Sequence, residues 1–181
     1  MSWLLAICSL LATIQSCTAE STSMTSNPPD TSPSPTATLS AFTISNLTSF
    51  RPRARLTTKL RSRISFTFSD PTVPNGVDVA TCELAWSSSA DQYAYHVPDY
   101  TRCSNPFFGF RISNKTYNGP GTFRLNLQHA YQVNKSDSEW TTFFANLTLG
   151  PRRMRCSSTS KGTTCRQKTA RLTAPITSSA P

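Results

Sequence analysis

The chain has 181 residues, and its 18 Lys and Arg against nine Asp and Glu give a formal net charge of +9 at pH 7. A field of this sign favours anionic partners. No zinc-finger, RNP-like or helix-turn-helix pattern accompanies the charge, which argues against a nucleic-acid-binding protein. The sequence also lacks G-x-S-x-G, H-E-x-x-H and glycine-rich phosphate loops, the motifs of several hydrolase and nucleotide-binding classes.

The N-terminal residues, 1–19, carry no charged side chain and predict a signal peptide. The apolar run 3–14 has about a dozen residues, whereas a membrane span needs about 20. Cys17-Thr18-Ala19 then fits the small-x-small pattern of signal peptidase sites. We therefore predict a secreted protein without a membrane span, and a buried N-terminal helix is the alternative. The end of the chain lacks the hydrophobic tail of a GPI signal.

Composition divides the rest of the chain into three parts. Residues 20–40 are nearly all Ser, Thr, Pro, Ala and Asn. They cannot bury enough apolar surface to offset their chain entropy, which predicts a disordered spacer with the composition of an O-glycosylated stalk. Residues 41–176 suit one domain, because about 140 residues can bury close to two-thirds of their unfolded surface. Residues 177–181 are expected to form a short disordered tail.

Apolar and polar residues alternate along most of this domain, as in strands with one buried face. Turn residues such as Asn118-Gly119-Pro120-Gly121 separate the alternating runs. Short strands with regular turn signals predict an all-β fold, a small antiparallel β-barrel or sandwich. The predicted strands are 42–44, 63–69, 77–86, 107–112, 123–133, 142–149 and 169–176.

Six cysteines are present, two of which are expected to leave with the signal peptide. The other four, Cys82, Cys103, Cys156 and Cys165, form an even number, which in an oxidising compartment predicts two disulfides. Four cysteines allow three pairings, and we favour Cys82–Cys103 with Cys156–Cys165 because each pair closes a local loop. A zinc site needs two close ligand pairs such as C-x₂₋₄-C, which the sequence lacks, so no metal or other cofactor is predicted.

Four N-x-[ST] sequons predict N-glycosylation of a secreted chain. They begin at Asn46, Asn114, Asn134 and Asn146. Asn146 falls on the polar face of its predicted strand, while Asn114 and Asn134 fall beyond strand ends. Three of the sequons are therefore placed at the surface independently of the motif itself.

The basic residues form two clusters, one before and at the start of the strand 63–69, the other around the last loop and strand. Either these clusters bind an anionic partner or they are a solvated face that only keeps the protein soluble. Three tyrosines near the first cysteine pair, Tyr93, Tyr95 and Tyr100, are a candidate aromatic surface. The candidate anion-binding residues are Arg51, Arg53, Arg55, Arg61, Arg63, Arg152, Arg153, Arg155, Lys161, Arg166 and Lys168.

Candidates for catalysis are few. His129 is in line with the apolar residues of its strand, which predicts a packed histidine with satisfied ring nitrogens. His96 lies among aromatic residues and a carboxylate, surroundings that suit a binding surface or an ordered loop equally. The acids are scattered and the cysteines are expected to be oxidised, so we predict a non-enzymatic protein with no catalytic residues. A small hydrolase using His96 or His129 is the alternative.

Along residues 40–176 the strands and cysteines follow one order: FTI at 42–44, ISFTFSD at 64–70, Cys82, Cys103, FFGF at 107–110, LNLQHAY at 125–131, Cys156, Cys165 and LTAP at 172–175. This order resembles the fungal secreted family typified by the Alternaria major allergen. The resemblance implies a compact β-barrel with two intrachain disulfides, paired first-with-second and third-with-fourth. It also implies a secreted or wall-associated protein without a settled enzymatic activity.

Members of that family have been treated as allergens and as effectors or elicitors that meet plant defence proteins. The resemblance therefore suggests an effector-like protein that binds a host extracellular protein or surface. The alternative is a structural or carbohydrate-binding cell-wall component that binds anionic glycan. The type member dimerises through an extra N-terminal cysteine; the candidate here, Cys17, is expected to leave with the signal peptide, so we expect a monomer or a non-covalent dimer.

Overall fold

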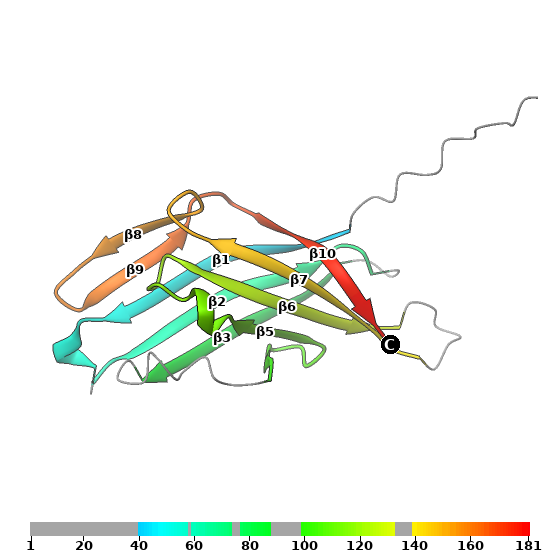
Figure 1. The fold of residues 1–181 in the computed structure, drawn as a ribbon, viewed down its shortest axis with the longest axis horizontal. Helices are drawn as coiled ribbons and strands as arrows, with labels where there is room; N and C mark the ends of the chain where they lie inside the picture. Colours follow the sequence, from blue (N-terminus) through cyan, green and yellow to red (C-terminus); the bar gives the residue numbers. More distant parts are fainter. Residues whose placement is uncertain (1–39, 58, 74–76, 88–98, 133–138) are drawn as a thin grey trace, which may run out of the picture. The chain divides into compact units, whose positions relative to one another are not determined.

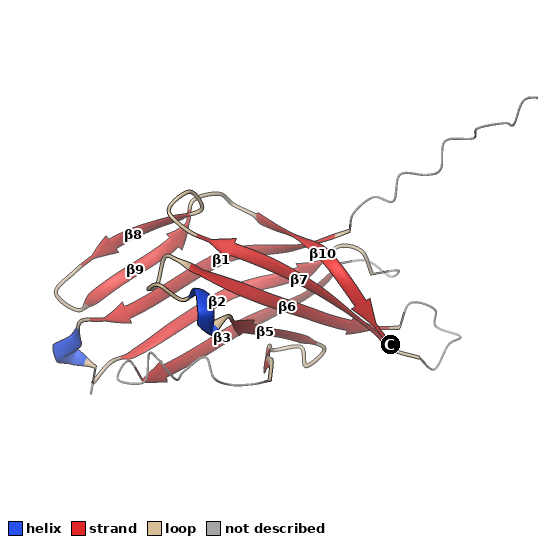
Figure 2. Ribbon diagram, in the orientation of Figure 1, coloured by secondary structure: helices blue, strands red, loops and turns tan. Residues whose placement is uncertain are grey.

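The computed structural model describes residues 40–57, 59–73, 77–87, 99–132 and 139–181, which form β-strands and two short 3₁₀ helices but no α-helix (Figures 1 and 2). The helices are η1 (Ala54–Leu56) and η3 (Asn114–Thr116). The strands are β1 (Ala41–Pro52), β2 (Arg61–Asp70), β3 (Asp78–Ser87), β4 (Thr101–Arg102), β5 (Phe108–Ile112), β6 (Phe123–Tyr131), β7 (Thr141–Leu149), β8 (Met154–Ser158), β9 (Gly162–Gln167) and β10 (Leu172–Ala180).

All strand pairs are antiparallel, and most of them lie on one path, β3-β2-β1-β10-β7-β6-β5-β4. The remaining hairpin, β8–β9, joins this path because β9 pairs with β1. Figure 1 shows the hairpin beyond β1, and it shows β10, β7 and β6 running at an angle across β1 and β2. The result is an antiparallel sheet nearly closed into a barrel, which confirms the predicted fold class.

Strand β1 is shared between two neighbours because it bends at a β-bulge. Residues 41–44 pair with β10, whereas residues 48–52 pair with β9. The register with β2 shifts between Ser45 and Thr48, and Asn46 has a positive φ of 56°. Asn tolerates this left-handed conformation better than most residues, and an extra residue bends a strand. The bulge therefore directs β1 away from β10 and toward β9.

The barrel closes at a seam between β3 and the segment that joins β4 to β5. Cys82 in β3 forms a disulfide with Cys103. Beside it, the Ser104 amide donates to the Thr81 carbonyl oxygen at 2.8 Å, and the Thr81 amide donates to Ser104 Oγ at 2.8 Å. The disulfide and these hydrogen bonds replace the ladder that a further strand pair would provide. The second predicted disulfide, Cys156–Cys165, is also present.

The core consists of the inward-facing residues of the alternating strands. Opposite strands meet through edge-to-face aromatic pairs, with ring centroids 4.9 Å apart for Phe66–Phe110 and 4.7 Å apart for Phe68–Phe108. Such pairs contribute about 0.5–1.5 kcal/mol beyond the burial of their area. The largest fully buried side chains are Phe42, Phe68, Phe108, Phe110, Phe123, Ile44, Leu47, Ile64, Leu125, Leu127, Leu147 and Leu149.

Several elements differ from the sequence prediction, among them the following three. The first strand continues to Pro52 instead of ending at residue 44, because the bulge interrupts its alternation. The segment between Cys156 and Cys165, which is expected to be a loop, consists of the ends of β8 and β9 and the tight turn 159–161, and its mostly exposed residues have no apolar period. The expected disordered tail is part of β10 as far as Ala180, because Ser178, Ser179 and Ala180 pair with β7 through backbone groups.

Candidate functional site: a basic face and a buried histidine

The two basic clusters of the sequence meet where β1 pairs with β9. In this ladder Phe50 lies opposite Thr164, and the backbone amide of Arg53 donates to the Lys161 carbonyl oxygen at 3.1 Å. Gly162 permits the close approach, because a Cβ at this position would collide with the carbonyl oxygen of Arg51. The pairing brings the cluster 51–63 alongside the cluster 152–168.

A first hollow, of about 510 Å³, lies between the clusters. Three of its basic residues lie just before β2 or at its start, and Lys161 lies in the β8–β9 turn. The side chain of Thr164 adds a hydroxyl group that can donate to a ligand oxygen, whereas the Thr159 hydroxyl donates to the Gly162 carbonyl oxygen at 3.3 Å. The lining residues are Phe50, Lys59, Leu60, Arg61, Arg63, Ala85, Thr159, Lys161 and Thr164.

A second hollow, of about 560 Å³, is formed by the β8–β9 hairpin alone. Arg155 on β8 lies directly opposite Arg166 on β9, and Ser157 lies opposite Thr164 one step along the same face. Lys168 follows the end of β9. The lining residues are Arg155, Cys156, Ser157, Thr164, Arg166, Gln167 and Lys168.

The two hollows share Thr164 and therefore adjoin each other. We call the surface that holds them the basic face, defined by Lys59, Arg61, Arg63, Arg155, Lys161, Arg166 and Lys168. Cross-strand partners continue the outer row of Arg155 and Arg166 through Thr48 and Ser65 to Glu83. An acidic side chain thus stands at the β3 end of that row, and the β8–β9 end is wholly basic.

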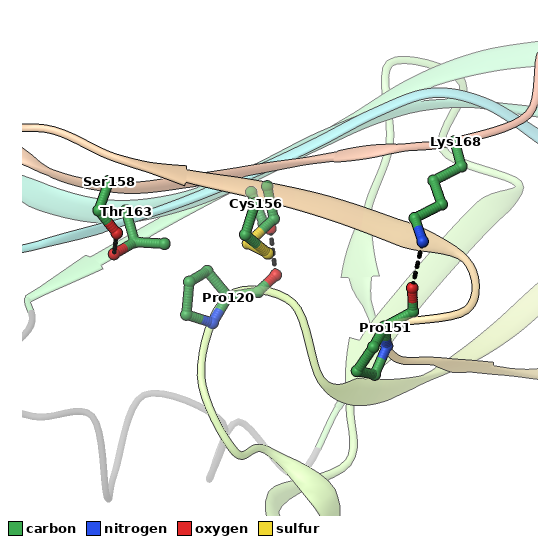
Figure 3. Close-up of a disulfide and its surroundings, with 8 residues drawn as sticks. Pro120, Pro151, Cys156, Ser158, Thr163 and Lys168 are labelled. Carbon is green, nitrogen blue, oxygen red and sulfur yellow. Dashed lines mark hydrogen bonds between the residues drawn. A yellow bond between two sulfur atoms is a disulfide. The ribbon is translucent and has the colours of Figure 1, made fainter.

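Some basic side chains also have structural contacts. The Arg63 guanidinium lies 5.7 Å from the centre of the Phe50 ring, a cation–π contact on the floor of the first hollow. Arg153 Nη1 donates to the Thr148 carbonyl oxygen at 3.1 Å. Lys168 Nζ donates to the Pro151 carbonyl oxygen at 2.6 Å, which fixes the base of the hairpin (Figure 3).

The remaining predicted anion-binding residues are distributed around this face. Arg51 and Arg53 line a third hollow of about 360 Å³ together with Gly162 and Thr163. Arg55 is exposed on η1. Arg152 is exposed in the turn before β8, outside all three of these hollows. The structure therefore unites most, but not all, of the predicted residues.

The Cys156–Cys165 disulfide fixes the hairpin beneath these charges. The two cysteines are directly opposed, one step from the Arg155–Arg166 pair. The loop before β6 packs on the disulfide: a Cβ on Gly121 would lie 2.6 Å from Cys156 Sγ, so only glycine fits. Ser49 Oγ donates to the carbonyl oxygen of Pro120 in the same loop, and Figure 3 shows Pro120 beside the disulfide of Cys156.

The sequons and tyrosines are placed as follows. Asn46 is exposed at the β1 bulge, where its Nδ2 donates to Thr67 Oγ1 at 3.3 Å. Asn146 is half-buried on β7, opposite Asn126. Asn114 begins η3. Asn134, Tyr93, Tyr95 and His96 lie outside the described residues. Tyr100 is half-buried, with the Arg111 guanidinium 4.9 Å from its ring centre, so it is engaged within the domain.

A second polar cluster, the His129 centre, lies at one end of the barrel and consists of the buried Asp70 and His129 with the partly exposed Thr72 and Asp78. His129 and Asp70 are both 0 % exposed. His129 Nδ1 lies 2.9 Å from Asp70 Oδ2, and the imidazole stacks on Phe108 with ring centres 3.7 Å apart. His129 Nε2 lies 3.3 Å from Asp78 Oδ2 without hydrogen-bond geometry. The histidine is packed as predicted, but only Nδ1 has a hydrogen-bond partner in the described residues.

Asp70 is ionised in this centre. Burial by itself would raise the pKa of its carboxyl group, but hydrogen bonds from His129 and Thr72, with the charge of His129, together hold that pKa below its usual value. The Thr72 amide and hydroxyl both donate to Asp70 Oδ1, at 2.8 Å and 2.6 Å. Because the carboxylate accepts from Nδ1, His129 carries a proton on that nitrogen.

This geometry favours a structural centre. A general base must come within hydrogen-bond reach of a substrate proton, and a fully buried imidazole stacked on Phe108 offers a substrate no access. The sequence could not reveal the centre, because Asp70 and Asp78 stand at predicted turn and strand-end positions that are far from His129 along the chain. Within the described residues there is no group of three His, Cys, Asp or Glu side chains suited to a metal ion. No helix described here is long and apolar enough to cross a membrane.

No family model, no curated protein and no solved structure matches the chain. Nothing in these comparisons links it to the Alternaria allergen family, so that resemblance stays a prediction. The two disulfides fit a protein that folds in an oxidising compartment.

Proposed function

We propose that the chain is a secreted, non-enzymatic binding protein whose basic face binds an anionic extracellular polysaccharide. One observation carries this proposal: two basic clusters that are separate in the sequence line adjoining hollows on one surface. A surface that served only solubility would not need its charges to gather around hollows. Concentrated charge of one sign raises the local concentration of an oppositely charged ligand.

The shape of the face supports a polymer as the ligand. The two hollows meet at Thr164 and extend from β2 across β1 and β9 to β8. A linear chain with repeated negative charges can contact both hollows at once, and each contact raises the effective concentration of the next. Threonine and serine hydroxyls in the lining can bond to sugar hydroxyls as well as to the charged groups.

The predicted compartment narrows the choice of anion. A signal peptide, two disulfides and surface sequons are typical of an extracellular protein, where acidic polysaccharides are abundant and nucleic acid is not. The resemblance to the Alternaria allergen family implies a fungal protein, and the polysaccharide would then belong to its own wall or to a host surface.

A second candidate function, effector-like binding of a host extracellular protein, is supported by a different feature. Phe107 and Trp140 are 46 % and 43 % exposed and stack on each other with ring centres 4.6 Å apart. Exposed aromatic side chains are typical anchors of protein interfaces. The polysaccharide proposal rests on more residues, so we place it first.

The test uses the mature, glycosylated protein on immobilised anionic and neutral polysaccharides. The variant K59Q/R61Q/R155Q/R166Q removes four charges from the basic face. We expect it to lose most of the binding, and we expect wild-type binding to weaken steeply with added salt. Equal retention of wild type and variant would contradict the proposal.

A matched control removes four charges elsewhere. Arg102, Lys115, Arg152 and Arg171 are exposed and line none of the three hollows described above. The variant R102Q/K115Q/R152Q/R171Q has the same net charge as the face variant, so we expect it to retain most of the binding. Host extracellular fluid passed over the immobilised protein in parallel tests the second candidate, for which loss of binding in F107A/W140A is the expected result.

A further inference from the structure

The most unusual feature of the basic face is a pair of arginines held directly opposite each other. Arg155 and Arg166 are cross-strand partners, and both are exposed. Like charges in this position destabilise an antiparallel pair. Neither guanidinium forms an ion pair with a carboxylate in the part of the chain that the structure describes. The hairpin therefore keeps an unfavourable arrangement that one substitution would relieve.

Two observations show that the arrangement is fixed. The Cys156–Cys165 disulfide occupies the next cross-strand position, so the arginines cannot separate by a slip of the register. The hairpin is also anchored at its base, where Lys168 Nζ donates to the Pro151 carbonyl oxygen. The backbone positions of the two arginines are thus set before any ligand arrives, so binding has to order only their side chains.

The surrounding donors form a three-dimensional set. Ser157 and Thr164 place hydroxyl groups on the same face as the arginines, and Lys168 lines the same hollow. A planar carboxylate presents two oxygens, which a single guanidinium can already satisfy in a bidentate pair. Two guanidinium groups and two hydroxyls can instead surround a tetrahedral group that presents three oxygens.

We infer that the Arg155–Arg166 pair is an oxyanion subsite that selects sulfate or phosphate esters over carboxylates. This inference rests on the proposed function, because the ester group would be a substituent of the anionic polysaccharide on the basic face. The remaining basic residues supply general attraction, and the hairpin supplies the chemical preference. The disulfide acts as a positioning element for the two arginines and does not touch the ligand.

Matched polymers provide the test. Dextran sulfate, phosphorylated dextran and carboxymethyl dextran of equal length and charge density share one backbone and differ only in the anionic group. We expect the first two to bind the mature protein about tenfold more tightly than carboxymethyl dextran, as one additional charge-assisted contact would provide. The two ester polymers also distinguish sulfate from phosphate as the better ligand.

The variant R155Q/R166Q should lose about tenfold in affinity for the ester polymers and with it the preference over carboxymethyl dextran. The control R53Q/R55Q removes two charges outside the second hollow, and should weaken all three polymers by one common, smaller factor. If R155Q/R166Q weakens all polymers by the same factor as the control, the subsite is wrong while the proposed function stands. If wild type binds none of the polymers, the proposed function fails and the subsite with it.

The melting temperature gives an independent readout. Because the variant relieves the repulsion between Arg155 and Arg166, R155Q/R166Q should melt at the same temperature as wild type or higher. A higher melting temperature of R155Q/R166Q together with its loss of ester binding would support a ligand-binding role for Arg155 and Arg166. A lower melting temperature would show that the arginines stabilise the hairpin, and would overturn the inference.

Discussion

Charged side chains have opposite surroundings in the His129 centre and on the basic face. In the His129 centre Asp70 and His129 are fully buried, and the carboxylate receives hydrogen bonds from Nδ1 and from Thr72. On the basic face Arg155 and Arg166 are exposed and oppose each other. An isolated charge is costly to bury, whereas water and salt screen a like-charged pair at the surface. The buried charges therefore serve the fold, and the exposed ones are available to a ligand.

The largest expected effect on stability comes from a substitution in the buried His129 centre. Replacing His129 by Ala leaves the Asp70 carboxylate buried without its main partner and removes the ring that stacks on Phe108. We expect the free energy of unfolding to fall by about 3–5 kcal/mol. Urea denaturation followed by tryptophan fluorescence measures this, and polysaccharide binding by the folded fraction should be unchanged.

The variant D78N is the control for the same centre. The Asp78 side chain is 46 % exposed and makes no hydrogen bond to His129. We expect the D78N substitution to lower the free energy of unfolding by less than about 1 kcal/mol. If D78N destabilises the protein as much as H129A, the pair of Asp70 and His129 is not the stabilising unit.

The two disulfides lie in different regions of the domain, so their removal should affect binding differently. Cys82–Cys103 closes the barrel seam, and Cys156–Cys165 fixes the basic hairpin. Loss of either bridge should lower the free energy of unfolding by about 2–4 kcal/mol. We expect C156A/C165A to weaken polysaccharide binding as well, while folded C82A/C103A binds like wild type. Calorimetry and binding on the same samples check both outcomes; equal binding losses would remove the distinction between seam and hairpin.

The pH dependence of stability tests the lowered pKa of Asp70 in the buried centre. Because the pKa of Asp70 is lower in the folded than in the unfolded chain, the unfolded chain takes up this proton first as the pH falls. The stabilisation is complete above the unfolded pKa, about 3.9, and is lost as the pH falls through the folded pKa. We expect D70N to show a shallower loss of stability than wild type below about pH 4. Parallel urea titrations would contradict this assignment.

The sequence predicted the buried strands well and the exposed ones poorly. Residues 64–70 and 123–131 alternate clearly because one face of each strand lies in the core. The hairpin strand β8 has a single buried residue, Met154, so hydrophobic periodicity could not reveal it. Arg155 on β8 and Arg166 on β9 were chosen as candidate anion-binding residues from charge alone. Their opposition across a ladder depends on pairing register, which the sequence does not display.

The same limit applies to the buried centre. His129 was predicted to be packed because it follows the apolar face of its strand, and the structure places it in the core. Its partner Asp70 lies on a strand that is not adjacent to β6 in the sheet. Only closure of the barrel brings these strands face to face. A contact between non-neighbouring strands leaves no periodic signal in the sequence.

The smallest predicted effect on stability is on the exposed side. The substitution R155E places opposite charges across the β8–β9 ladder, where like charges now stand. We expect a gain of about 0.2–1 kcal/mol, measured as a rise in melting temperature, together with loss of binding to sulfated polymers. The matched variant R152E, in the turn before β8, should leave both quantities nearly unchanged. A destabilised R155E would indicate that Arg155 has an attractive role in the hairpin.

Binding of an anionic extracellular polysaccharide by the basic face can be tested directly. The most direct measurement compares wild type, K59Q/R61Q/R155Q/R166Q and the equally charged R102Q/K115Q/R152Q/R171Q for retention on dextran sulfate over a salt gradient. We expect wild type and the second variant to elute late and the face variant to elute much earlier. Co-elution of the two variants would show that retention follows net charge alone, and would contradict a dedicated binding face.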